Sequence, residues 1–240
     1  MIDVPVVCRC RISAGVLVLA AMCLSGCGGP ATYTSAEHHA FTLQPGDLKR
    51  YGIAFVTPSS ITGREQDRQS LALTFASELK ARYPALRVVT LSETLGALNR
   101  AGMLQDYKQM FVDYEETGIF DRRRLKGVSE VTGTRYLAQL KLAGFRQENA
   151  GRFGFFGIRV LETKRATLRV FLQIWDSEEG TIAWEGYEEM NFAKDTYSEQ
   201  GVTFHDIAAA IARHMVSVLP YRTAEADDAS QQARSDPATD

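Results

Sequence analysis

Three pairs of adjacent carboxylates are the residues in this sequence best suited to general acid–base chemistry. They are Glu115–Glu116, Glu178–Glu179 and Glu188–Glu189. Acid–base work on one substrate atom requires two such groups to converge, but neighbouring residues of a strand point to opposite faces. If Glu188 and Glu189 lie in a strand, they cannot meet. We therefore expect all three pairs to be solvated surface residues.

Histidine and serine are present, but their spacing matches no hydrolase or nucleotide motif. The sequence contains no Gly-x-Ser-x-Gly, no His-Glu-x-x-His and no Gly-x-x-x-x-Gly-Lys-Ser/Thr. His205 and Asp206 stand at the expected start of a helix, where capping explains them, and His214 lies between core-facing positions of that helix. His38 and His39 lie in a polar segment without further metal ligands. The sequence therefore predicts no catalytic residues, no metal site and no cofactor.

Two other clusters suit binding better than catalysis. The first is a run of three arginines: Arg122, Arg123 and Arg124. It could meet an acidic partner or phosphate groups, and the alternative is the solvated face of a short helix. The second is a group of three phenylalanines: Phe153, Phe155 and Phe156. They belong to a glycine-rich segment, 144–157, that predicts a loop or flap; exposed rings would mark a partner site, and buried rings would cap a sheet.

One cysteine stands in a context that predicts its processing. Arg9 and Arg11 precede an apolar run, Ile12 to Leu24, which is followed by Ser25-Gly26-Cys27. This order is typical of a secretory signal peptide. The run has 13 residues, fewer than the roughly 17 to 25 that a membrane-spanning helix needs. The alternative is an uncleaved anchoring helix with an incidental cysteine.

Leu24-Ser25-Gly26-Cys27 is similar to the lipobox of bacterial lipoproteins. The resemblance implies that Cys27 becomes the first residue, carries lipid on its sulfur and is acylated on its new amine. In enterobacterial sorting an aspartate after this cysteine retains a lipoprotein in the inner membrane. By that resemblance, Gly28 favours the outer membrane, with the folded domain facing the periplasm.

Composition agrees with a lipid-anchored protein that has no affinity for nucleic acid. With 27 Lys and Arg against 29 Asp and Glu, the net charge is −2, which gives no general attraction to nucleic acid. Three of the four cysteines, Cys8, Cys10 and Cys23, lie in the segment expected to be removed. Lipidation would consume the thiol of Cys27, so the mature chain would have no disulfide although its compartment permits one.

Apolar periodicity divides the chain into four segments. We expect a signal peptide at 1–26, a flexible tether at 27–48, one domain at 49–220 and a disordered tail at 221–240. Within the domain, strands are expected near 50–56, 86–89, 136–142, 167–175 and 181–190. Helices are expected at 65–82, from an N-cap at Ser92 to about Gly102, at 104–117, from a cap at Asp121 to Gly133, and from a capping box at Thr203 and Asp206 to Pro220.

This order, βαβααβββα, predicts an α/β (mixed α+β) fold with a single mixed β-sheet of about five strands and helices packed on it. Three segments, 51–58, 132–137 and 172–184, carry a family resemblance. They resemble the α/β domain shared by the TolB N-terminal domain, the curli-secretion lipoprotein CsgG and the penicillin-binding-protein activator LpoB. The resemblance implies assembly or scaffolding work in the cell envelope, done through contacts with another protein and without catalysis.

Two alternatives remain open at this point. A lipid-anchored envelope hydrolase would need a deep pocket with a converging histidine or carboxylate pair. A secretion-pore subunit like that of the curli branch would need long amphipathic hairpins, with about 9 to 11 residues per spanning strand. We expect no pair of such strands between Gly144 and Thr163, so the sequence disfavours a pore.

Overall fold

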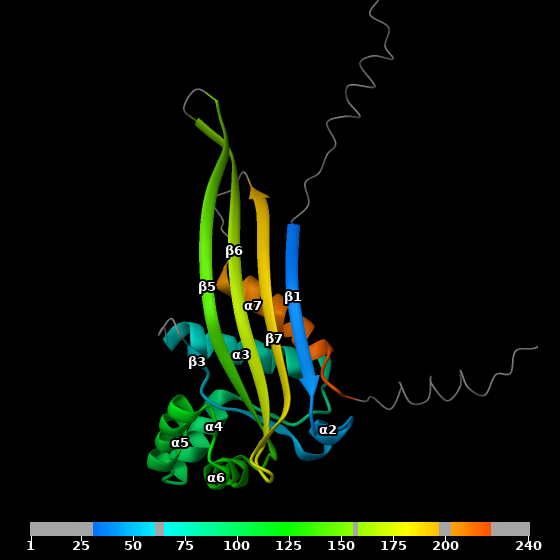
Figure 1. The fold of residues 1–240 in the computed structure, drawn as a ribbon, viewed down its shortest axis with the longest axis vertical. Coiled ribbons are helices and arrows are strands. Elements are labelled where there is room, and N and C mark those ends of the chain that lie inside the picture. The colour runs from blue at the N-terminus through cyan, green and yellow to red at the C-terminus, as the bar shows by residue number, and fades with distance from the viewer. Residues whose placement is uncertain (1–30, 61–64, 156–157, 197–202, 222–240) are drawn as a thin grey trace, which may run out of the picture.

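The computed structural model describes residues 31–60, 65–155, 158–196 and 203–221. The elements follow in this order: β1 (Ala31–Ala40), α2 (Asp47–Tyr51), β2 (Ile53–Phe55), β3 (Ser59–Ser60), α3 (Glu65–Arg82), β4 (Val88–Val89), α4 (Leu91–Arg100), α5 (Leu104–Thr117), α6 (Arg122–Thr132), β5 (Tyr136–Phe155), β6 (Ile158–Asp176), β7 (Thr181–Thr196) and α7 (Phe204–Ser217). Figure 1 shows four long strands side by side, with the helices gathered on one face and at one end.

All the described strands join one mixed sheet. Six of them follow the order β1-β7-β6-β5-β2-β4, and β3 pairs with β5 beside β2. Strands β5, β6, β7 and β1 are antiparallel neighbours, whereas β2 is parallel to both β4 and β5. The predicted α/β class with a single mixed sheet is therefore confirmed. The sheet has seven strands rather than about five, because β1 and β3 were not expected.

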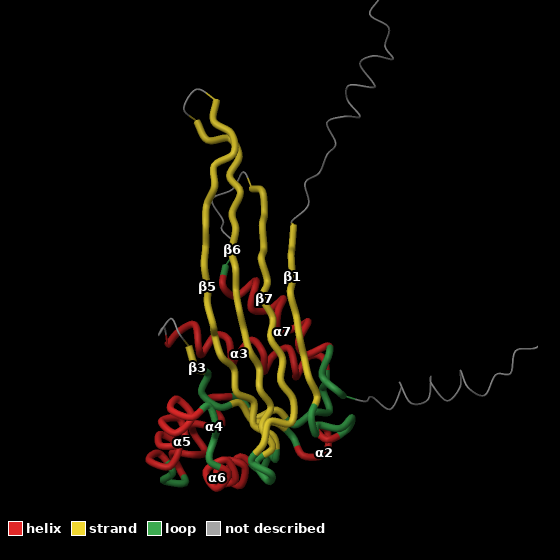
Figure 2. The backbone as a smooth tube through the Cα atoms, viewed as in Figure 1, coloured by secondary structure: helices red, strands yellow, loops and turns green. Residues whose placement is uncertain are grey.

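The two faces of the sheet are covered differently. Helices α3 and α7 pack across one face and bury alternate residues of the long strands, such as Leu140, Leu168 and Leu172. A second, smaller core lies on the opposite face, where Leu137 and Trp175 pack against α4, α5 and α6. That second cover reaches only one end of the strands, as Figure 2 shows.

Most helices begin and end where sequence chemistry predicts, but helix α2 (Asp47–Tyr51) was not expected, and the strand expected near 50–56 is shorter, at Ile53–Phe55. Asp121 caps α6 by accepting a bond from the Arg124 amide, and Thr203 forms a capping box with Asp206 at α7. Gly118 ends α5 with a positive φ of 73°, a conformation that glycine adopts without strain. The prediction for α4 is wrong by two residues, because Thr90 rather than Ser92 is the N-cap and pairs with Glu93.

Residues 31–48 are not the flexible tether predicted for 27–48. Residues 31–40 form β1, which pairs with β7 from Ala31↔Ala193 to Ala40↔Trp184. Further along, Leu43 and Leu48 are buried in the main core. The strand has no apolar alternation because it lies at the edge of the sheet with its side chains largely exposed. Pairing of the main chain needs no hydrophobic pattern, so the polar composition was misleading.

The predicted loop or flap at 144–157 is also wrong where the structure describes it. Strands β5 and β6 continue as a hairpin arm, paired from Tyr136↔Asp176 to Phe155↔Ile158. Register shifts at Leu142/Gly144 and near Gly151 absorb glycines that had indicated a loop. Strand β7 likewise continues past Met190 to Thr196. The expected absence of long amphipathic strands between Gly144 and Thr163 is therefore wrong as to length, since long paired strands occur there.

Candidate functional site

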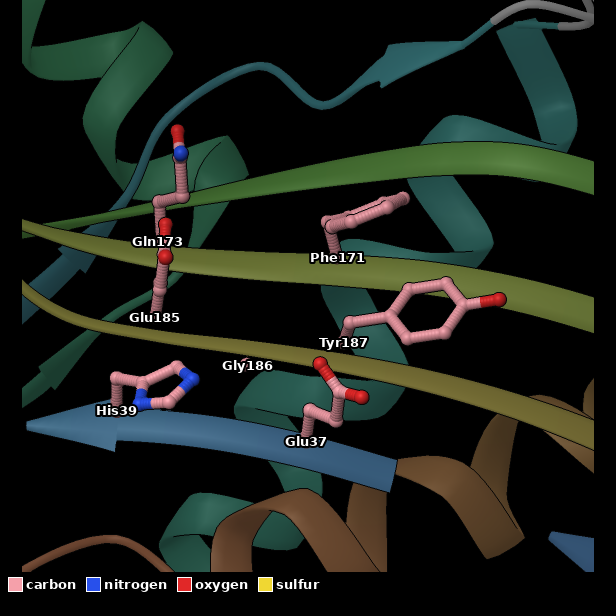
Figure 3. Close-up of a pocket in the computed structure, with 7 residues that line it drawn as sticks. All are labelled: Glu37, His39, Phe171, Gln173, Glu185, Gly186 and Tyr187. Carbon is pink, nitrogen blue, oxygen red and sulfur yellow. The ribbon is translucent and has the colours of Figure 1, made fainter. Parts of the chain in front are cut away.

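One cavity on the described surface, of about 360 Å³, lies at α5 and α6 beside Arg123 and Arg124, and three others lie on the sheet face opposite α3 and α7. Beyond the cover of α4–α6, strands β6, β7 and β1 present their alternate side chains to solvent there (Figure 3). Register sets these residues in two rows. Phe171, Tyr187 and Glu37 stand side by side in one row, and Gln173, Glu185 and His39 stand in the next. We call these six residues the open-face site.

An aromatic pair forms the centre of the open-face site. The ring centroids of Phe171 and Tyr187 are 4.6 Å apart, with the ring planes tilted by 41°. Phe171 remains 39% exposed, and what distinguishes it from other exposed apolar side chains is its close contact with a second aromatic ring. The six residues, with Gly186, line a shallow cavity of about 280 Å³. A partly exposed aromatic pair of this kind suits recognition of a ligand or partner.

The carboxylates of this face differ in how they are paired. Glu189 accepts hydrogen bonds from Arg169 Nε at 2.7 Å and from the Tyr187 hydroxyl at 3.0 Å. These bonds, that from Arg169 first, lower the pKa of the Glu189 carboxyl. Burial, followed by the bond to Glu189, raises the pKa of Tyr187, which therefore stays a donor. The network fixes the Tyr187 ring in place beside Phe171.

The hollow continues toward β5 and along the strands. A second cavity of about 230 Å³ shares Phe171, Gln173 and Glu185 with the open-face site and adds Tyr114 and Lys141. Tyr114 donates a 3.3 Å bond to Gln173 Oε1, which fixes that amide. A third cavity of about 460 Å³ lies farther along the same face, around Arg169 and Glu189. Together they make an elongated surface of the kind that suits an extended ligand.

The packed face holds a second titratable pair, His214 and Glu188. Glu188 lies on β7 with no solvent exposure, and its Oε2 is 3.0 Å from His214 Nδ1 on α7. Its other oxygen, Oε1, is buried without a partner. Burial raises the pKa of Glu188, opposed by the bond to His214. Glu189 points to the opposite face, so these two adjacent carboxylates cannot converge, as predicted. The expectation that both are solvated is wrong, because Glu188 faces α7 and is buried.

The residues singled out from the sequence fall in other places. Leu24, Ser25, Gly26, Cys27 and Phe156 lie outside the described residues, and Phe153 and Phe155 lie in the hairpin arm. Within α6, Arg122 Nε donates to the Glu178 carbonyl at 2.5 Å and Arg124 pairs with Asp113 at 2.7 Å. Both therefore hold α6 to its neighbours, and Arg123 stays exposed. None of these described residues lies in the open-face site.

The open-face site was missed although the sequence carries one signal for it. Phe171 occupies an outward position of β6, between Arg169 and Gln173, where an aromatic side chain interrupts a polar series. The partners of Phe171 could not be inferred, because Glu37 and His39 had been assigned to a tether. Among the described residues, no group of three or more His, Cys, Asp or Glu side chains could hold a metal ion. No helix in the described ranges is long and apolar enough to cross a bilayer.

Comparison with known proteins gives only distant likenesses. The sequence matches no protein-family model, and it matches no curated protein. A PelC dodecamer subunit from Paraburkholderia phytofirmans is 14% identical, with a TM-score of 0.45 over 80% of this chain and 100% of that one. Lipoprotein GNA1162 from Neisseria meningitidis is 12% identical, with a TM-score of 0.41 over 69% of this chain and 97% of that one. The C-terminal domain of LpoB from Salmonella enterica is 12% identical, with a TM-score of 0.34 over 62% and 86%. At these values the likenesses assign neither a family nor a function to the chain.

Proposed function

We propose that this chain is a lipid-anchored protein of the cell envelope that works as a scaffold or assembly factor. Its domain faces the periplasm from the outer membrane and binds another envelope protein through the open face of its sheet. The observation that carries the proposal is the pair of Phe171, which is exposed, and Tyr187, which is half-buried, set among polar side chains on an uncovered part of the sheet. Aromatic residues surrounded by polar groups are typical of the centre of protein interfaces.

The anchor part of the proposal rests on Cys27 and the residues before it. A single acyl chain holds a protein to a bilayer only marginally, at about 0.8 kcal/mol per buried CH₂, so stable attachment takes more than one chain. Replacing Cys27 with Ala should release the protein from the membrane fraction of the producing cells. If the variant stayed with the membranes as the wild type does, the lipid assignment would fail.

The partner is best sought by photo-crosslinking in living cells from within the open-face site. A photoreactive phenylalanine analogue can replace Phe171, which keeps an aromatic ring at that position. The control carries the analogue at Leu73, which is 64% exposed on α3, the helix that covers the other face. The proposal expects one protein to be captured repeatedly from position 171 and not from position 73. Capture of lipid alone, or of no protein, from position 171 would contradict it.

An envelope hydrolase is the second candidate, and one observation favours it. His39, Glu37 and Glu185 line the same cavity, as an acid–base pair would. However, no hydrogen bond within the described residues orients His39 toward either carboxylate, and the cavity is shallow. Incubation of the purified protein with isolated peptidoglycan is the direct test of this alternative. Release of soluble fragments, lost on Glu185→Gln, would establish hydrolysis over scaffolding.

The length of the hairpin arm removes one objection to a secretion-pore subunit, but its composition raises another. Residues 146–149 (Arg, Gln, Glu and Asn) pair with residues 164–167 (Lys, Arg, Ala and Thr) in the middle of the arm. A lipid-facing strand needs apolar residues at alternate positions, and this stretch supplies none on either strand except Ala166. We therefore keep the scaffold proposal ahead of the pore.

A further inference from the structure

Within the described residues, two carboxylates of the open-face site form no hydrogen bond or ion pair, whereas a third on the same face accepts three hydrogen bonds. Glu189 is bonded by Arg169, Tyr187 and Asn191. In the described part of the chain, Glu37 and Glu185 make no hydrogen bond and no ion pair. They lie on neighbouring strands, in adjacent rows of the register, with Tyr187 and His39 completing the square. This corner of the sheet therefore carries negative charge that nothing in the structure neutralises.

One of the two carboxylates, Glu37, stands directly opposite an aromatic residue, and both line the same cavity as the aromatic pair. Glu37 lies opposite Tyr187, which in turn stacks on Phe171, and Glu185 lies one row away, opposite Gln173. An aromatic face attracts a cation through its quadrupole, and the attraction adds to that of a nearby carboxylate. Carboxylates and partly exposed rings on one surface thus complement a positively charged group that is flat or has an apolar stem.

Among the described residues, no Lys or Arg side chain forms an ion pair with either carboxylate of this corner. Lys141 lies on β5, opposite Phe171, and strands β6 and β7 separate it from Glu37 on β1. Arg169 already forms an ion pair with Glu189. The segment after the last described residue, 222–240, is itself acidic, with five Asp and Glu against two Arg. A metal ion is also a poor match, because the described residues offer no group of three ligating side chains here. Within the described part of the chain, Glu37 and Glu185 are therefore open to a cation from another molecule.

We propose that the open-face site binds an arginine or lysine side chain in an extended, basic segment of the protein partner. The inference rests on the proposed function and specifies the chemistry of the partner. The elongated hollow along β6 and β7 receives the segment, and Glu37 and Glu185 pair with its cationic group over the ring of Tyr187 or Phe171. Arginine binds more tightly than lysine, since its planar guanidinium both stacks on a ring and pairs with a carboxylate. Lys141 repels the same charge at the β5 side and so sets the direction of the segment.

The test uses capped hexapeptides and the full mature lipoprotein in a neutral detergent. One peptide alternates arginine with serine, and its matched partner alternates glutamate with serine. Affinities are measured by microscale thermophoresis for the wild type and for two double variants with the same change in charge. The first is Glu37→Gln with Glu185→Gln. The control is Glu130→Gln with Glu179→Gln, two exposed carboxylates away from the open face.

We expect the wild type to bind the arginine peptide and not the glutamate peptide. The open-face double variant should lose about tenfold in affinity, and Phe171→Ala about fivefold, whereas the control stays within about twofold. Equal losses in the two double variants would show general charge attraction and overturn the proposal. Binding of calcium that depends on Glu37 and Glu185, without binding of the peptide, would overturn it in favour of a metal site.

The peptide experiment and the crosslinking experiment fail separately. A protein captured from position 171, with no preference for arginine peptides, would leave the scaffold proposal standing and remove the basic segment. Arginine binding that depends on Glu37 and Glu185, with no protein captured in cells, would leave the site standing and remove the scaffold proposal.

Discussion

Strand β6 runs through two different environments on its two faces, and the contrast separates stability from recognition. On the packed face, Leu168, Val170 and Ile174 have no solvent exposure beneath α3 and α7. On the open face, Arg169 and Phe171 pair with Glu189 and Tyr187 of the neighbouring strand, and both remain exposed to solvent. Because these side chains add little to the core, they are free to specify a partner. Substitutions on the two faces of one strand should therefore have different consequences.

The largest expected effect is that of Leu168→Ala on the packed face. Removing a fully buried leucine side chain should lower the free energy of unfolding by about 2–5 kcal/mol, since the cavity left behind adds to the lost burial. Phe171→Ala, three residues along the same strand, removes more atoms but should cost only about 1 kcal/mol. Urea denaturation of both variants measures the contrast. Equal losses would mean that the open face is part of the core.

A smaller effect is expected where the second core closes the other face, at Tyr107. Its hydroxyl accepts a 2.8 Å bond from the Thr57 amide and lies 2.9 Å from Thr57 Oγ1, and burial raises the pKa of Tyr107 to about 12. Tyr107→Phe keeps the ring but leaves the Thr57 amide without its acceptor, which should cost about 1–2 kcal/mol. Thermal unfolding provides the measurement. A variant as stable as the wild type would show that water replaces the hydroxyl.

Glu188→Gln should change stability in a pH-dependent way, with the sign set by burial. The pKa of Glu188 is raised above its ordinary value of 4.5, chiefly by burial. Its contribution to stability is therefore fully present below pH 4.5 and is lost as the pH rises through the raised value. The glutamine can donate to His214 Nδ1 without a charge, so the variant should gain on the wild type by up to about 1 kcal/mol across that range. Unfolding curves from pH 4 to 8 for both proteins would contradict this if their difference stayed constant.

The smallest effect is expected from Arg169→Ala on the open face. The Arg169 side chain is 53% exposed in its pair with Glu189, and such surface pairs contribute about 0–1 kcal/mol. Stability should hardly change at physiological salt. A loss as large as that of Leu168→Ala would show that the polar network, rather than the packed face, holds the long strands together.

The sequence predicted the helices better than the strands, for physical reasons visible in particular residues. Helix α3 was placed at its observed bounds because Leu71, Phe75 and Leu79 repeat on one stripe, and α6 because Asp121 and Gly133 enclose it. Strand β1 escaped notice because an edge strand with exposed side chains is held by its main chain. The part of β5 beyond Leu142 could not be predicted, because its glycines lie at β-bulges.

The open-face site could not be predicted, because it depends on strand pairings that the sequence does not indicate. Its six residues come from three separate segments, at 37–39, 171–173 and 185–187. Their meeting depends on the β1–β7 pairing, which leaves no local signature in the sequence. The outward position of Phe171 was visible, but a single aromatic residue cannot specify a site without its neighbours.

If Cys27 carries lipid as proposed, the start of β1 limits how the domain can be oriented on the membrane. Ala31 lies four residues after Cys27, and four residues of extended chain span at most about 14 Å. Strand β1 begins at the end of the sheet toward which the hairpin arm points (Figure 1). With Cys27 lipidated as proposed, the long strands would run perpendicular to the bilayer. The end of the sheet that carries the β5–β6 arm would face the bilayer, and the end covered by α4–α6 would lie farthest from it. Depth quenching by spin-labelled lipids should then be stronger for a fluorophore at Thr34 than for one at Glu116, and the reverse ranking would invert the orientation.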